Sequence, residues 1–145
     1  MRVGIVGSGN IVVTCLNAIS QIAEITCEAI VVRESSRAKG EALAKEFGMN
    51  KIYTDYQALL NDPEIDIVYI GIPNNLHYEY ALAALYAHKH VVCEKPFTSN
   101  SGELLTLSDI ARKNNLFLLE AITLLYSPNF QYIKENFEKV GDIKL

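Results

Sequence analysis

The chain has few cysteines, and their positions exclude several common uses of thiols. Its 145 residues contain three cysteines, Cys15, Cys27 and Cys93, which are odd in number and widely spaced in the sequence. They form no Cys-x-x-Cys pair and have no histidine at the spacing of a zinc site. We therefore expect reduced thiols, a cytoplasmic protein and no metal centre.

Long apolar segments and a broad positive charge are also missing. The longest strongly apolar run, residues 65–72, is far shorter than the roughly 20 residues that span a bilayer, and residues 7–10 interrupt the first run too early for a signal peptide. The net charge of −4 argues against duplex nucleic acid as a partner. With 50% hydrophobic residues, the chain has the composition of a globular domain, and we expect neither nucleic acid nor membrane as a partner.

β-Branched apolar segments alternate regularly with helical patterns. Strands are expected near residues 3–6, 25–32, 51–54, 65–72, 91–93 and 116–119. Helices are expected at residues 11–22, from Ser35 or Ser36 to Gly48, at 55–60, at 76–88, and from Ser99 or Ser101 to about Asn114. This alternation predicts right-handed crossovers and an α/β fold with a doubly wound parallel sheet.

The pattern changes after residue 120. Ser127 and Pro128 are expected to start a helix that ends near Lys139, and residues 141–145 begin a new strand without a partner. We therefore expect residues 1–120 to form one domain. Residues 121–145 are expected to be a crossover helix and the start of a truncated second domain.

The first strand leads into a glycine turn. Gly7 and Gly9 lie where the chain must turn tightly and let a phosphate approach the backbone. The next helix directs its free N–H groups and the positive end of its dipole at that turn. Two glycines can also serve tight packing alone, so the strand–helix–strand context is what favours nucleotide binding. Because Val12 stands where this fingerprint usually has glycine or alanine, we expect helix and strand to lie slightly further apart.

Further candidates share the carboxyl ends of the expected strands, where open parallel sheets bind ligands. After the second strand, an arginine suits the 2′-phosphate of NADP and an acid suits the 2′-hydroxyl of NAD. Arg33 and Glu34 favour opposite choices, so both cofactors stay open. Asn74 can contact the cofactor or simply form a turn.

Lys95 follows a buried strand and lies between Glu94 and Pro96. Its ammonium group can hydrogen-bond a substrate hydroxyl or carbonyl and exchange a proton as hydride moves, with Glu94 orienting it. A lysine at the end of a strand is also commonly just solvated. The residue types alone leave both interpretations open.

Three segments, residues 4–11, 73–77 and 91–96, resemble the Gfo/Idh/MocA oxidoreductases in sequence, order and separation. That family includes glucose-fructose oxidoreductase and inositol dehydrogenase, and the Glu-Lys-Pro element is its most specific motif here. The resemblance implies a Rossmann domain that binds NAD or NADP, followed by a substrate-binding α/β domain that forms a homo-oligomer. It implies that Lys95 is the catalytic lysine. The candidate cofactor contacts are Gly7, Ser8, Gly9, Asn10, Ile11, Arg33, Pro73, Asn74, His77, Glu94 and Lys95.

We therefore expect the cofactor half of an oxidoreductase that transfers hydride to or from a sugar, polyol or related hydroxylated compound. The family's substrate-domain residues would lie beyond residue 145, so the fragment should bind cofactor and turn nothing over. The alternative is a non-catalytic nucleotide-binding or sensor module on the same fold. The Glu94-Lys95-Pro96 element favours the enzyme.

Overall fold

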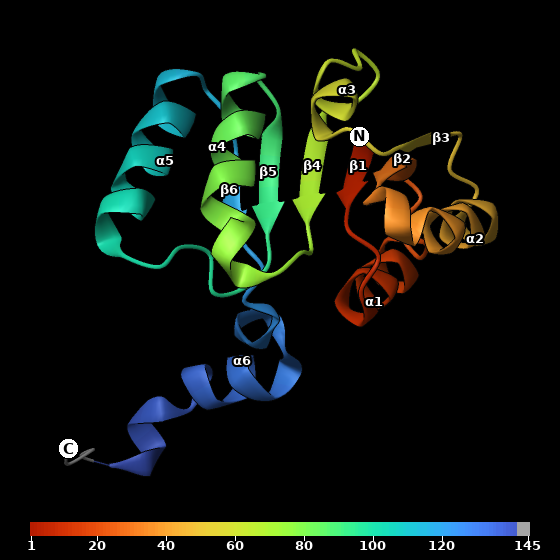
Figure 1. Ribbon diagram of the computed structural model, residues 1–145. Coiled ribbons are helices and arrows are strands. Elements are labelled where there is room, and N and C mark those ends of the chain that lie inside the picture. The colour runs from red at the N-terminus through yellow and green to blue at the C-terminus, as the bar shows by residue number, and fades with distance from the viewer. Residues whose placement is uncertain (142–145) are drawn as a thin grey trace.

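The computed structural model describes residues 1–141, in which strands and helices alternate (Figure 1). The strands are β1 (Arg2–Val6), β2 (Thr26–Val31), β3 (Lys51–Tyr53), β4 (Ile67–Ile70), β5 (His90–Cys93) and β6 (Leu118–Glu120). The helices are α1 (Asn10–Ile19), α2 (Arg37–Phe47), α3 (Tyr56–Leu60), α4 (His77–Tyr86), α5 (Ser101–Lys113) and α6 (Pro128–Glu135). Single 3-10 turns occupy Glu34–Ser36, Asn74–Leu76, Thr123–Tyr126 and Phe137–Val140.

All six strands belong to one parallel sheet in the order β3-β2-β1-β4-β5-β6. The chain builds outward from β1 to β3, then crosses over to β4 and builds outward in the other direction. The expected doubly wound sheet is therefore confirmed. The order reverses between β1 and β4, and in such sheets ligands bind beyond the carboxyl ends of the strands at this point.

Each face of the sheet carries its own core. Val3 and Ile5 of β1 pack with residues of α1 and α2 on one face. Val6 packs on the other face, with residues of α3, α4 and α5. Consecutive side chains of a strand point to opposite faces, so β1 contributes to both cores. Figure 1 shows α4 and α5 side by side over β5 and β6.

The N-cap of α5 differs from the expectation. Neither Ser99 nor Ser101 caps this helix, because Asn100 holds the N-cap position and its Oδ1 accepts a hydrogen bond from the Glu103 backbone N–H at 3.0 Å. Glu103 in turn accepts from the Ser99 N–H at 2.9 Å. These reciprocal bonds satisfy donors at the helix start, as in a capping box.

Three other expected helix boundaries are confirmed, whereas α1 and α4 end at Ile19 and Tyr86, earlier than expected. Ser36 is the N-cap of α2, although its side chain makes no capping hydrogen bond, and Gly48 ends that helix in the left-handed conformation. Ser127 caps α6 through the N–H of Phe130. This helix ends at Glu135, short of the expected Lys139, and continues as a 3-10 turn. Most of the strand expected at 141–145 lies outside the described residues.

Apolar side chains from β6 onward remain exposed. The relative exposure of Leu119 is 51% and that of Tyr126 is 78%. Figure 1 shows α6 beyond the carboxyl ends of the strands, away from the body of the sheet. No helix within residues 1–141 has both the length and the apolar character needed to cross a membrane.

Val12 fits against the sheet because Gly71 lies opposite it. Val12 is fully buried, and a Cβ added to Gly71 would lie 2.7 Å from Val12 Cγ2 and 3.0 Å from Tyr69 Cε1. The bulk that the fingerprint usually avoids on the helix is thus accommodated by a missing side chain after β4. Packing of α1 on the sheet depends on both positions.

We expect Gly71→Ala to lower the free energy of unfolding by about 1–3 kcal/mol, because the added methyl overpacks this contact. Val12→Ala in the same chain should recover part of that loss by opening space for the methyl. Chemical denaturation of both single variants and the double variant measures the coupling. Strictly additive losses would show that the two positions do not share this space.

Candidate cofactor site

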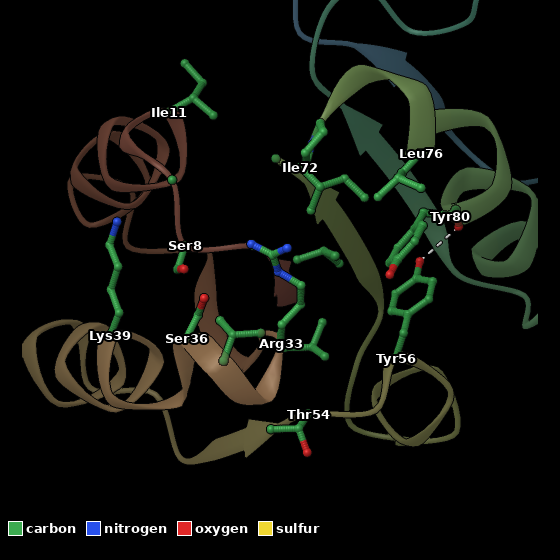
Figure 2. Close-up of a pocket in the computed structure, with 17 residues that line it drawn as sticks. Ser8, Ile11, Arg33, Ser36, Lys39, Thr54, Tyr56, Ile72, Leu76 and Tyr80 are labelled. Carbon is green, nitrogen blue, oxygen red and sulfur yellow. Dashed lines mark hydrogen bonds between the residues drawn. The ribbon is translucent and has the colours of Figure 1, made fainter.

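A cavity of about 560 Å³ opens beyond the carboxyl ends of β1, β2 and β4 (Figure 2). It lies where the order of the sheet reverses and has the size of a small-molecule or cofactor site. The lining residues come from the expected loops and from the neighbouring helices. They are Val6, Gly7, Ser8, Gly9, Ile11, Val31, Val32, Arg33, Ser36, Lys39, Thr54, Tyr56, Gly71, Ile72, Pro73, Leu76 and Tyr80.

The turn after β1 needs glycine at position 7. Its φ is +105°, its N–H donates to the Val31 carbonyl at 2.9 Å, and a Cβ would lie 2.5 Å from the Gly71 oxygen. Any side chain would therefore collide with the β4 turn. Gly7 holds the two turns of the switch point in close contact.

Gly9 has a different role. Its φ of −73° is open to any residue, and an added Cβ would meet no protein atom within 4 Å. The fold thus gives no reason for glycine here, yet the position lines the cavity at the N-cap of α1. The bare backbone and the free N–H groups of the first helical turn fit a phosphate that approaches closely. The residues present therefore fit the pyrophosphate of a dinucleotide.

Basic and hydroxyl side chains line the end of the cavity formed by β2 and α2. Figure 2 shows Arg33 extending into the middle of the cavity, with Ser36 and Lys39 on the side of α2. Glu34 does not line it, because its carboxylate binds Arg37 at 2.9 Å on the exposed surface. No carboxylate occurs among the described residues that line this cavity.

Two tyrosines close the opposite end. The rings of Tyr56 and Tyr80 stack with centroids 4.5 Å apart and an interplanar angle of 25°. The Tyr56 hydroxyl donates to the Tyr80 carbonyl at 3.0 Å, which joins the start of α3 to α4 (Figure 2). Burial raises the pKa of Tyr56, so this hydroxyl remains a donor.

The Glu-Lys-Pro loop follows β5 on the same edge of the sheet. Lys95 is exposed, and its peptide bond to Pro96 is cis. The carboxylate of Glu94 is largely buried and accepts from the Tyr69 hydroxyl at 2.8 Å and from the Lys95 N–H at 3.4 Å. Glu94 therefore holds the backbone at Lys95, whereas the sequence led us to expect that it orients the ammonium group.

His77 is fully buried at the start of α4. Its Nδ1 lies 2.8 Å from the Pro96 oxygen and its Nε2 lies 2.9 Å from the Ile72 oxygen. The ring does not line the cavity described above. The structure thus places the ring between two loops, whereas the family resemblance implied that it contacts the cofactor.

The predicted residues therefore separate into two groups. Those that line the cavity are Gly7, Ser8, Gly9, Ile11, Arg33 and Pro73. Those that lie on the same edge of the sheet but outside this lining are Asn10, Asn74, His77, Glu94 and Lys95.

Sequence reasoning missed Lys39, Tyr56 and Tyr80. Lys39 follows Ser36 by three residues, so the shared helix face was a usable signal. The tyrosines are 24 residues apart and meet only through the fold.

The cysteines lie apart from this site. Cys93 is fully buried, and burial raises the pKa of its thiol to about 12. Burial likewise raises the pKa values of Cys15 and Cys27 to about 11. All three therefore remain protonated and poorly nucleophilic near neutral pH. Over the part of the chain that the structure describes, no group of three or more His, Cys, Asp or Glu residues could hold a metal ion.

Known proteins match this chain over most of its length. It is 33% identical over 144 residues to the scyllo-inositol 2-dehydrogenase (NADP(+)) IolU of Bacillus subtilis, covering 99% of this chain and 43% of that protein. It is 36% identical over 128 residues to D-xylose 1-dehydrogenase (NADP(+)) 2 of Haloferax volcanii, covering 88% and 39% of the two chains. The chain thus spans less than half the length of these relatives.

A solved structure shows the same arrangement. KijD10, a 3-ketoreductase from Actinomadura kijaniata in complex with NADP and TDP-benzene, superposes with a TM-score of 0.89 at 29% identity. The match covers 96% of this chain and 42% of that one. The model of an oxidoreductase family with an NAD-binding Rossmann fold matches residues 1–121. The resemblance inferred from the three sequence motifs is therefore confirmed, and the chain belongs to the Gfo/Idh/MocA family of NAD(P)-binding oxidoreductases.

Proposed function

We propose that this chain is the cofactor-binding part of an NADP(H)-dependent oxidoreductase that acts on a sugar, polyol or related hydroxylated compound. The observation that carries the choice of cofactor is the cavity end formed by Arg33, Ser36 and Lys39 without a carboxylate. A 2′-phosphate there would meet two cations and a hydroxyl donor. Glu34, which argued for NAD in the sequence, is paired with Arg37 on the surface.

The remaining cavity fits the rest of the dinucleotide. The backbone at Gly7 and Gly9 would receive the pyrophosphate, with the α1 dipole favouring its charge. The adenosine ribose that carries the 2′-phosphate would lie at Arg33, in the middle of the cavity, so its adenine ring would extend toward Tyr56 and Tyr80. When bound, the cofactor supplies or accepts hydride.

Lys95 would exchange the proton of the substrate hydroxyl. Its exposed amine follows β5 on the same edge of the sheet as the cavity, where a substrate can approach from solvent. An ammonium group carries three donors on a flexible stem, which suits hydrogen bonding to a developing alkoxide or a carbonyl oxygen. Glu94 fixes the backbone from which this side chain extends.

The rest of the substrate site would come from residues outside this chain. Relatives with inositol and xylose dehydrogenase activities are more than twice as long as the matched region. We infer that residues 121–145 lead into that second part of the protein. Substrate choice would then depend mainly on side chains beyond this sequence.

Cofactor choice can be tested by charge removal. We expect Arg33→Ala and Lys39→Ala each to weaken NADPH binding by about tenfold or more, because each removes a charge-assisted hydrogen bond. NADH binding should change much less. Fluorescence titration of both reduced cofactors measures the two effects. Lys45→Ala, which removes an exposed charge from the same helix, is the matched control, and equal losses for both cofactors would contradict the proposed 2′-phosphate contact.

The role of Lys95 can be tested in a protein that contains both this chain and the proposed second part. Lys95→Met should lower kcat by about a hundredfold or more, because proton transfer by a positioned group contributes at least that much. Cofactor affinity should stay close to that of the unsubstituted protein. Absorbance of the reduced nicotinamide, followed over a panel of sugars and polyols, measures the rate, and Lys113→Met is the control. Cofactor binding without turnover of any panel member by the unsubstituted protein would instead indicate a sensor.

A further inference from the structure

We propose that His77 is the positioning residue that sets Lys95 relative to the cofactor, by linking the turn after β4 to the loop after β5. The inference rests on the function proposed above, in which Lys95 exchanges the substrate proton. It differs from the role expected from the sequence, in which the imidazole itself contacts the cofactor.

The two ring nitrogens of His77 contact backbone oxygens of two different loops. Nε2 lies 2.9 Å from the oxygen of Ile72, which lines the cofactor cavity. Nδ1 lies 2.8 Å from the oxygen of Pro96, the residue directly after Lys95. One rigid ring thus connects the wall of the cavity to the backbone that carries the amine.

Other contacts also hold this loop, but they end elsewhere. The Phe97 N–H donates to Glu120 at 2.9 Å, and Glu94 binds the Tyr69 hydroxyl. Glu120, Glu94 and Tyr69 do not line the cofactor cavity. Among the described hydrogen bonds of this loop, the His77 bridge is therefore the one that reaches a residue lining the cavity.

The chemistry of the ring allows its two contacts to be separated. Both partners are carbonyl oxygens, which only accept hydrogen bonds, so a neutral ring, which carries one N–H, donates to one of them and an imidazolium ring donates to both. The amide nitrogen of an asparagine side chain reaches about as far as Nδ1, and that of glutamine about as far as Nε2. His77→Asn should therefore keep the contact to Pro96, and His77→Gln the contact to Ile72.

The experiment measures the position of Lys95 through its reactivity. The 145-residue chain is treated with trinitrobenzenesulfonate with and without saturating NADPH, and peptide mapping gives the modification rate of Lys95. Exposed Lys113 is the internal reference. In the unsubstituted chain, NADPH should slow modification of Lys95 and leave that of Lys113 unchanged.

Substitution of His77 should weaken this protection selectively. We expect protection of Lys95 to fall by about tenfold in His77→Ala, because the free energy of one hydrogen bond corresponds to about that factor. Both amide variants should lose part of the protection because each keeps one contact of the bridge, and His77→Asn, which keeps the contact next to Lys95, should retain more than His77→Gln, with comparable NADPH affinity for both. A general loss of packing would instead lower thermal stability and NADPH affinity together. It would give no difference in Lys95 protection between the asparagine and glutamine variants.

The outcomes separate the two hypotheses. If His77→Ala fails to fold, the comparison of the asparagine and glutamine variants still decides. Protection that is the same in the unsubstituted chain and in both amide variants overturns the positioning role and leaves the cofactor site intact. A chain that does not bind NADPH overturns the proposed function, and the positioning role with it.

Discussion

The close approach of the turns after β1 and β4 is the constraint on which the site depends. Gly7 lies so close to the Gly71 carbonyl that a Cβ would lie 2.5 Å from its oxygen, and the Gly7 N–H donates to the Val31 carbonyl of the neighbouring strand. This contact brings the start of α1 to the edge of the sheet and leaves its first N–H groups facing the cavity. The proposed anion site would thus be a product of strand packing, because the same bare backbone that lets the turns meet would also admit a phosphate.

The two sides of the carboxyl edge of the sheet carry different functional groups. On the side of β2, Arg33 and Lys39 line the cavity, and their charge would select the cofactor in the function proposed above. On the side of β5, the chain places a flexible amine on a backbone that is fixed from both neighbours. The proposed proton transfer would depend on rigid loops more than on large contact areas, since a small displacement of the amine would slow it.

Much of this arrangement could be predicted from the sequence. The alternation of strands and helices and the glycine turn gave the fold and one wall of the cavity, because these patterns act locally. The sequence could not predict that Arg33 lines the cavity and Glu34 does not, since Glu34 is paired with Arg37 on the surface. The cap of α5 was misassigned for the same reason: Asn100 and both serines are all good caps, and the reciprocal bond with Glu103 decided between them.

The burial of His77 and the stacking of Tyr56 on Tyr80 had no local signal at all. His77 contacts a loop that follows the next strand, 19 residues later, and the tyrosines stack only when α3, which lies in the crossover, packs beside α4.

The pairing of Val12 with Gly71 has a consequence for how such domains diverge. Val12 on α1 is tolerated because the residue opposite it in the turn after β4 is Gly71, which has no side chain. The side-chain size at one of these two positions is therefore constrained by the residue at the other. Natural variants should carry compensating changes at both, so the bulk at the helix start and the bulk at the opposite turn would vary inversely across the family.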